Sequence, residues 1–372
     1  MAEDTPDPTR IPGAPHPRET LELIGQDVAQ NAFLDAFNSR RLHHAWLLTG
    51  PRGVGKATLA WRIARFLLST PDPDPDDMFG APVPNTLDVS PEHPVARRIA
   101  AGADPGLKSV HRTENEKTKR LRDQITIDDI RALGSFFQLS ATDGGRRVVI
   151  IDAADDMNVN AANALLKMLE EPPARTTLLL ICHQPSRLLP TIRSRCRTLR
   201  LGTLDPSQME QAMAQAGVDP GPDATALAEL SAGSVGDALR LSLLGGLQIY
   251  REVVHLLGTL PNLDRGRALA LAEAAAGRGA EEKLDLLYTL IDVALSRLAR
   301  TGALGHPPAV EAAPDEAAIL MRLAPHAAQA RAWAHTAQTA LARARHGRAV
   351  NLDPAALVLD TLFKLSETAP AR

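Results

Sequence analysis

Cysteine is almost absent from this chain of 372 residues, which contains only Cys182 and Cys196. Two cysteines cannot build a disulfide framework, and neither belongs to a C-x-x-C pair or a cysteine–histidine cluster with the spacing of metal ligands. The composition therefore argues against a disulfide-stapled secreted domain and is compatible with a reducing cytoplasm. We expect a cytoplasmic protein with no zinc and no other bound metal.

An excess of charge of either sign is also lacking, because the net charge is −3 and the sequence pI is near 6.4. This balance argues against a protein that binds nucleic acid on its own. No apolar run reaches the roughly 18 residues of a membrane span. The first residues, MAEDTPDPTRIPGAPHP, have neither the basic nor the apolar part of a signal peptide, so we expect residues 1–20 to be a disordered lead-in.

Up to about Leu204, short apolar runs alternate with helical patterns. The predicted strands are residues 45–48, 107–111, 146–152 and 176–183, and the predicted helices are residues 56–69, 126–140 (started by Asp128) and 158–173. Continuous apolar runs are typical of strands that are buried on both faces of a parallel sheet. Strands that alternate with helices predict an α/β domain.

After Leu204 the strand pattern ends and the sequence favours helices. Three short helices are predicted between residues 206 and 246, and Ala/Leu-rich helices follow from Leu247, including 281–300 and 326–345. Because no heptad pattern is sustained, the sequence favours a helical bundle over a coiled coil.

The turn after the first predicted strand carries most of a phosphate-binding loop. Gly50, Gly55 and Lys56 fit the pattern G-x-x-x-x-G-K-[ST], but Ala57 stands where a hydroxyl normally holds Mg²⁺. Such a loop works because backbone N–H groups and a helix N-terminus converge on a phosphate, and its glycines allow positive φ and close approach. The sequence therefore predicts the loop without its metal ligand.

The second half of such a site is an apolar strand that ends in an acid, here Asp152. Ala153 follows where hydrolysing members of this class have a glutamate that activates water. Thr58 lies about 100° around the helix from the missing hydroxyl, and Asp155 and Asp156 are interpreted as a solvated turn or helix cap. Loss of both groups predicts that ATP is not hydrolysed here. The vestigial nucleotide site then comprises Gly50, Gly53, Gly55, Lys56, Thr58 and Asp152.

Two further motifs, ANALLKMLEEPP (162–173) and LLPTIRSRC (188–196), closely resemble the clamp-loader subunits of bacterial DNA polymerase III. The resemblance covers about residues 20–245, and over the C-terminal helices it is one of pattern only. The missing catalytic groups indicate the delta-prime branch of this family rather than the motor branch, gamma/tau. The implied fold is an AAA+ module with a small helical lid, followed by a helical collar. The implied domains are a lead-in (1–20), an α/β domain (21–204), a lid (205–246) and a collar (247–372).

The resemblance also implies a role. Subunits of this family form a hetero-pentameric ring of gamma/tau-like, delta-like and delta-prime-like members, which places the sliding clamp on primed DNA as part of the polymerase III holoenzyme. The implied contribution of this chain is Arg195, flanked by Ser194 and Cys196 in the SRC motif, which would project into the nucleotide site of a neighbouring subunit and balance charge there. On this reading the chain is not an enzyme by itself.

The chain departs from the family pattern at other places. A further catalytic arginine of the motor subunits falls on Gly236 in GSVGDA (233–238). The four-cysteine zinc module that many relatives carry is missing, and the segment 69–94, too rich in proline and aspartate for a regular element, stands in its place. Because Lys56 is retained, the sequence requires no cofactor but leaves weak binding of ATP or ADP open.

Less specific interpretations stay open for several of these features. The chain is alternatively a self-sufficient AAA+ ATPase or an ATP-binding regulatory sensor, and Arg195 is alternatively a surface ion-pair partner. Three histidines have no partner at metal spacing: His43, His44 and His183. The basic residues Lys117, Lys119, Arg120 and Arg122 are interleaved with Glu114 and Glu116, which favours a solvated loop over contact with DNA.

Overall fold

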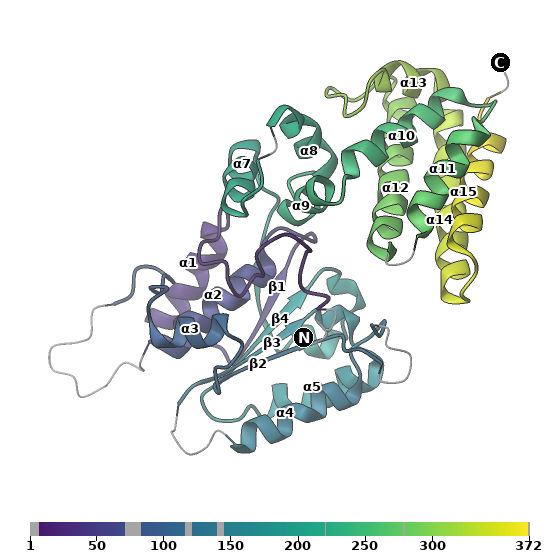
Figure 1. Ribbon diagram of the computed structural model, residues 1–372. Coiled ribbons are helices and arrows are strands. Elements are labelled where there is room, and N and C mark those ends of the chain that lie inside the picture. Colours follow the sequence, from purple (N-terminus) through teal and green to yellow (C-terminus); the bar gives the residue numbers. More distant parts are fainter. Residues whose placement is uncertain are drawn as a thin grey trace. The chain divides into compact units, whose positions relative to one another are not determined.

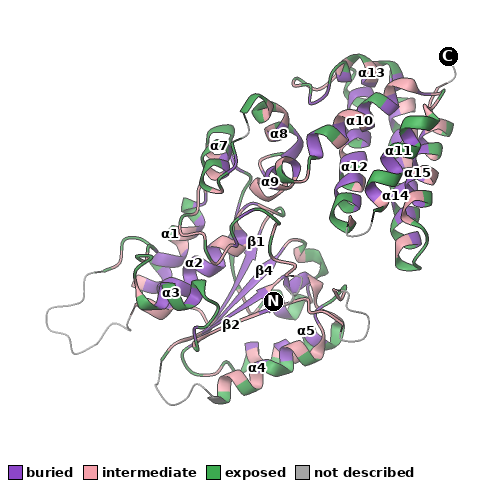
Figure 2. Cartoon of the chain, in the orientation of Figure 1, coloured by how far each residue is buried: buried purple, intermediate pink, exposed green. Residues whose placement is uncertain are grey.

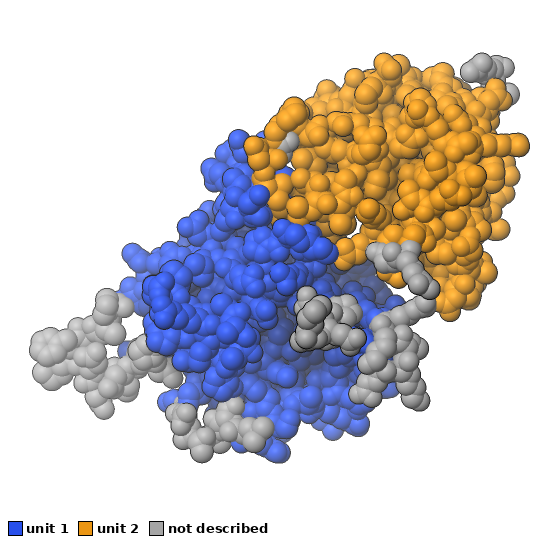
Figure 3. All heavy atoms as spheres, in the orientation of Figure 1, with its two compact units in different colours: residues 1–217, 233–236 blue, residues 218–232, 237–372 orange. Residues whose placement is uncertain are grey.

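The computed structural model describes residues 7–70, 83–115, 121–139, 145–219, 221–277 and 280–370. The chain divides into two compact units, residues 1–217 with 233–236 and residues 218–232 with 237–372 (Figure 3). The first unit holds the sheet, and the second is helical.

A five-stranded sheet forms the centre of the first unit (Figure 1). Its strands are β1 (Ala45–Thr49), β2 (Leu107–His111), β3 (Arg147–Asp152), β4 (Thr176–Cys182) and β5 (Arg197–Arg200). They lie in the order β2-β3-β4-β1-β5, and all neighbouring pairs are parallel. The four strands predicted from apolar runs are confirmed. The fifth was not predicted, because β5 buries only Leu199 and exposes its other three residues.

Helices cover both faces of this sheet, as the buried strands in Figure 2 require. The helices of this unit are α1 (Asp27–Asn38), α2 (Lys56–Ser69), α3 (Pro94–Ala100), α4 (Ile127–Leu139), α5 (Val159–Glu170), α6 (Pro190–Arg193) and α7 (Pro206–Gln215), with short 3₁₀ turns η2 (Ala154–Asp156) and η3 (Pro185–Arg187). Side chains alternate between the two faces. Trp46 and Leu48 join the core beneath α1, α2 and α3, whereas Leu47 joins the core beneath α4 and α5.

Local signals set the ends of these helices. The side chain of Asn158 caps α5 by accepting a hydrogen bond from the backbone N–H of Ala161 at 2.8 Å, and α5 ends before the proline pair. The prediction that α4 starts at Asp128 is wrong by one residue. It begins at Ile127, and the Asp129 carboxylate accepts hydrogen bonds from the backbone N–H and the hydroxyl of Thr126, both at 2.7 Å.

The second unit contains helices only, so a predicted α/β domain followed by an all-helical region is confirmed. Its elements are η4 (Gly221–Asp223), α8 (Ala224–Ser231), α9 (Val235–Leu243), α10 (Gly246–Thr259), α11 (Arg265–Ala276), α12 (Glu281–Leu304), α13 (Glu316–Leu323), α14 (Ala327–Ala349) and α15 (Pro354–Thr368). The first residues of α9 are counted with the first unit, and α7 belongs to that unit too. The predicted lid is thus divided between the units, and its boundaries stay a prediction.

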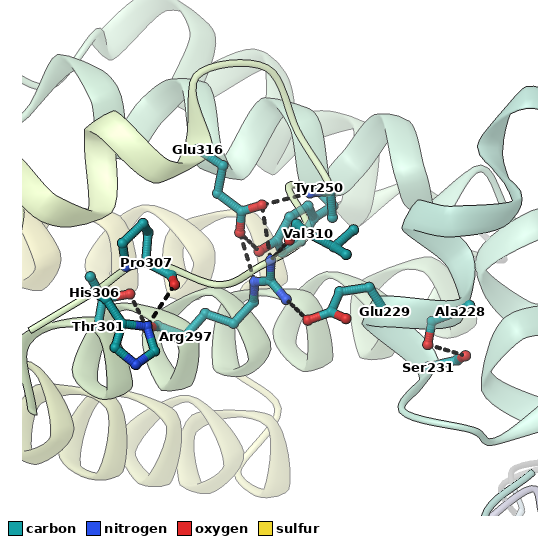
Figure 4. Close-up of polar contacts among 11 residues, drawn as sticks. Ala228, Glu229, Ser231, Tyr250, Arg297, Thr301, His306, Pro307, Val310 and Glu316 are labelled. Carbon is teal, nitrogen blue, oxygen red and sulfur yellow. Dashed lines mark hydrogen bonds and ion pairs between the residues drawn. The ribbon is translucent and has the colours of Figure 1, made fainter. Parts of the chain in front are cut away.

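A buried ionic network ties four helices of the second unit together (Figure 4). Arg297 of α12 contacts Glu316 of α13 through Nε at 2.8 Å and Glu229 of α8 through Nη1 at 2.7 Å. The hydroxyl of Tyr250, on α10, donates to the same Glu316 carboxylate, which is fully buried. Because a buried carboxylate is stable only when it is paired and hydrogen-bonded, this network fixes how the four helices pack.

Part of the expected disordered lead-in is ordered instead. The ring of His16 is buried and packs edge-on against Trp61 of α2 at 5.8 Å. The guanidinium of Arg65, also on α2, donates to the backbone oxygens of Arg18 at 2.8 Å and Thr20 at 2.6 Å. These contacts hold residues 16–20 against α2, and no periodic pattern in the segment indicates them.

Some predictions fall outside the described residues: the basic positions Lys117, Lys119 and Arg120, with Glu116, and residues 71–82 of the proline-rich segment. Residues 83–93 contain no helix or strand, as expected, but α3 begins at Pro94. None of the helices in the described ranges combines the length and the apolar composition that crossing a membrane requires.

Candidate functional site

The predicted phosphate loop connects the carboxyl end of β1 to the first turn of α2. Gly50, Gly53 and Gly55 have φ values of 147°, 75° and 97°, which side chains rarely adopt. A Cβ atom on Gly50 would also lie 2.3 Å from the backbone oxygen of Leu201, directly after β5. The glycines therefore have the positive φ that the sequence predicted, and their role in nucleotide binding stays a prediction.

The side chain of Lys56 folds back onto its own loop. Its side chain is buried, and Nζ donates to the backbone oxygens of Gly50, at 2.7 Å, and of Pro51. Burial lowers the pKa of Lys56 to about 8 and raises the pKa of Asp152 to about 6. The attraction between the two charges opposes both shifts. The structure thus brings the predicted lysine and acid into one electrostatic cluster, in which the lysine is already bound to its own loop.

The two alanines at the catalytic positions belong to the protein core. Ala57 is partly buried and packs against the cluster beneath α1, α2 and α3, and Ala153 is buried directly after β3. Thr58 is half-buried in the first turn of α2. The methyl groups of Ala57 and Ala153 offer neither a metal ligand nor a base at these positions.

A second segment of the first unit lies directly on the loop. The backbone N–H of Gly236 donates to the backbone oxygen of Gly53 at 2.9 Å, and the Ser234 hydroxyl donates to that of Arg52 at 2.9 Å. A Cβ atom on Gly236 would lie 2.8 Å from the Cα atom of Gly53, and one on Gly53 would lie 2.2 Å from Ser234 Oγ. We call these four residues the loop contact. It leaves no space for an arginine at position 236.

The interpretation of Asp155 as a solvated residue is wrong. Its side chain is buried and accepts hydrogen bonds from the backbone N–H groups of His183, at 3.0 Å, and Gln184, at 2.9 Å. It therefore joins η2 to the segment after β4. Asp156 is partly exposed and pairs with Nε of Arg112 at 3.3 Å. Asp155 also lines a pocket of about 480 Å³ with Arg122, Asp123, Gln124, Thr126, Asp156, Asn158 and Arg187.

Arg195 follows α6 and is partly exposed. Its Nη2 atom lies 2.8 Å from Oε1 of Glu170, the last residue of α5, and its Nη1 atom donates to the backbone oxygen of Thr191 at 3.0 Å. Ser194 also donates to Thr191, at 3.1 Å, through its hydroxyl. Cys196 packs against the core beneath α4 and α5, and burial raises its pKa to about 12. Within its own chain Arg195 is thus the surface ion-pair partner of the alternative interpretation, paired with Glu170, and Ser194 and Cys196 are its structural neighbours.

Arg195 and the phosphate loop lie at opposite ends of the parallel strands. Thr49, the last residue of β1, is level with Arg200, the last residue of β5, and the loop starts there. Arg195 comes before β5, whose four residues advance by roughly 13 Å along the strand at about 3.3 Å per residue. The structure therefore does not bring Arg195 to the loop of its own chain.

Two of the three histidines considered as metal ligands, His43 and His44, contact each other. His43 and His44 stack with ring centroids 4.4 Å apart, and Nε2 of His44 lies 3.0 Å from the backbone oxygen of Leu169. Burial lowers the pKa of His44. Within the described part of the chain, no group of three or more histidine, cysteine, aspartate or glutamate side chains has a metal-binding arrangement. The expectation that no metal binds stays a prediction.

Comparisons with known proteins point to one family. Residues 25–205 match the family described as "DNA polymerase III, delta subunit". DNA polymerase III subunit delta' of Pseudomonas aeruginosa is 43% identical over 168 residues, which are 45% of this chain and 46% of the relative. Subunit delta' of Escherichia coli K12 is 30% identical over 263 residues, which are 70% of this chain and 72% of the relative.

Subunit tau of E. coli K12 is also 30% identical, over 338 residues that make up 82% of this chain and 47% of the relative. The chain thus spans about half the length of the Pseudomonas delta' and E. coli tau relatives. A solved structure of a gamma subunit-related protein from Thermotoga maritima aligns with a TM-score of 0.45 and 15% identity, over 90% of this chain and 99% of that one.

Proposed function

The chain belongs to the family of DNA polymerase III delta' subunits, and on this premise we propose that it is a clamp-loader subunit that does not hydrolyse ATP itself. In this proposal it joins gamma/tau-like motor subunits and a delta-like subunit in a hetero-pentameric AAA+ ring. It supplies Arg195 to the nucleotide site of a neighbouring motor subunit. The ring then loads the sliding clamp onto primed DNA during replication.

The position of Arg195 is the observation that carries this proposal. Arg195 lies at the amino ends of the strands, whereas the loop of the same chain lies at their carboxyl ends. A partly exposed guanidinium that cannot reach its own loop is suited to a phosphate on another subunit, because its planar fork of donors matches phosphate oxygens. This supports a role in trans over the alternative of a self-sufficient ATPase.

The state of the loop supports the absence of hydrolysis in this chain. Lys56 donates to loop carbonyls, and position 57 carries a methyl group in place of a metal ligand. The third catalytic group of the motor subunits is an arginine, and here Gly236 stands at its position and packs against the loop. Hydrolysis needs a held metal ion, an oriented water and compensation of the charge that develops. The loop therefore serves as a structural turn, which packs against Leu201 at Gly50 and against Gly236 at Gly53.

The experiment is a reconstituted ATPase and clamp-loading assay with Arg195→Ala. Arginine fingers contribute about 10³–10⁵ in rate at a single site, or roughly 4–7 kcal/mol of barrier. Because only one of several motor sites adjoins this subunit, total turnover should fall a few-fold while clamp loading falls much further. Arg195→Lys should not rescue either activity, since an ammonium lacks the planar fork.

Arg193→Ala is the matched control, because Arg193 is an exposed arginine that lies two residues before Arg195, at the end of α6. It should leave both activities at the wild-type level. Gel filtration must show that each variant assembles normally. Wild-type turnover and loading from a complete Arg195→Ala assembly would refute the proposed role of Arg195.

A further inference from the structure

The guanidinium of Arg195 is held in a retracted position by its own subunit. Nη1 donates back to the backbone oxygen of Thr191, one turn earlier, and Nη2 meets the carboxylate of Glu170 at 2.8 Å. The side chain is therefore folded along α6 and toward the end of α5 rather than extended from the surface. Glu170 is the charged partner in this arrangement, and half of its side chain is exposed.

We propose that Glu170 is a positioning residue that holds Arg195 in this retracted state until a phosphate on the neighbouring subunit displaces the carboxylate. This inference rests on the proposed function, because it assigns the regulation of the same arginine. The carboxylate and a phosphate compete for the N–H donors of Nη2, since both offer anionic oxygen acceptors to the guanidinium. A neighbouring site without a triphosphate thus leaves Arg195 paired within its own chain.

The exposure of the pair makes such an exchange feasible. The Arg195 and Glu170 side chains are 36% and 50% exposed, so solvent screens their attraction. Pairs of this kind alter an equilibrium by roughly 1.4- to 5-fold, whereas a triphosphate carries more charge and offers more acceptor oxygens. The carboxylate therefore restrains the arginine without preventing its release.

The retracted state itself can be tested on the isolated full-length chain. Phenylglyoxal reacts with the deprotonated guanidine, which a paired carboxylate disfavours, and mass spectrometry reports the modification of each arginine separately. Glu170→Gln should raise the rate of labelling at Arg195 by roughly 1.4- to 5-fold at low salt, and 0.5 M salt should shrink this gain. Labelling of Arg193 is the internal reference and should not change.

Glu171→Gln is the matched control variant, because it makes the same change at the adjacent exposed position. It should leave the labelling of Arg195 at the wild-type rate. A general effect of losing an acid at the end of α5 would act through both variants, so a gain confined to Glu170→Gln reports the pair with Arg195. Unchanged labelling of Arg195 in Glu170→Gln would overturn the retracted state.

Reconstituted assemblies test the consequence. With Glu170→Gln, the Arg195-dependent part of ATP turnover should reach half its maximum at an ATP concentration roughly 1.4- to 5-fold lower than in wild type. In an Arg195→Ala background, the same substitution should have no effect. An effect that persists without Arg195 would refute the assignment of Glu170. If Arg195→Ala alone leaves turnover unchanged, the proposed function fails instead, and with it the regulation.

Discussion

The loop contact makes a sharp prediction for one substitution, Gly236→Ala. The added Cβ atom would lie 2.8 Å from the Cα atom of Gly53, which is closer than real contacts allow, so the two backbone segments must separate. Overpacking of this kind costs about 1–3 kcal/mol, and weakening the hydrogen bond from Gly236 to Gly53 adds about 0.5–1.5 kcal/mol. Replacing a helical glycine by alanine returns about 0.5–1 kcal/mol. We expect a net loss of about 0.5–4 kcal/mol.

The matched control is Gly134→Ala in α4, where an added Cβ atom meets nothing within 4 Å. The same chemical change should there stabilise the protein by about 0.5–1 kcal/mol. The assay is thermal unfolding by calorimetry, with tryptophan fluorescence to assign the transitions, because Trp46 and Trp61 lie in the first unit and Trp333 in the second. A Gly236→Ala variant as stable as Gly134→Ala would refute the close approach on which the loop contact depends.

Three further predictions concern burial and the loop. Arg297→Met should destabilise the second unit by about 3–5 kcal/mol because Glu316 is left buried and unpaired, whereas Arg343→Met, which breaks an exposed pair, should cost at most about 1 kcal/mol in the same denaturant titration. Burial raises the pKa of Asp152 to about 6, so the folded state holds a proton that the unfolded state releases near pH 4. The contribution of Asp152 to stability should therefore fall by up to about 3 kcal/mol as the pH rises from about 4 to 6, and Asp152→Asn should remove this fall. Calorimetry should find only weak binding of ATP, because Nζ of Lys56 must first leave the loop carbonyls. This binding should not change with Mg²⁺, because Ala57 lacks the hydroxyl that holds the ion; micromolar, Mg²⁺-dependent binding would contradict this.

The sequence predicted the parts of the sheet that are buried on both faces. Residues 176–182, for example, are all buried, and residues 178–182 form one apolar run, so their pattern alone indicates a strand. The edge strand β5 reads RTLR and buries a single leucine, which leaves no apolar run to find. Its existence depends on pairing with β1, a tertiary contact that no local pattern reports.

The candidate site was predictable in its residue types but not in its contacts. The pattern identified Gly53 and Lys56, and it showed that an arginine is missing at position 236. That Gly236 is required by a backbone contact with Gly53 emerges only from the fold, because the two residues are far apart in the sequence. Asp155 was misread for the same reason, since its partners are backbone groups 28 and 29 residues away.

The central claim is that this chain contributes to catalysis through its neighbour and not through its own loop. The most direct measurement compares steady-state ATP turnover of two fully reconstituted assemblies, one carrying Lys56→Ala and the other Arg195→Ala. The account predicts wild-type turnover with Lys56→Ala and a few-fold loss with Arg195→Ala. Either loss of turnover with Lys56→Ala or wild-type turnover from Arg195→Ala would contradict it.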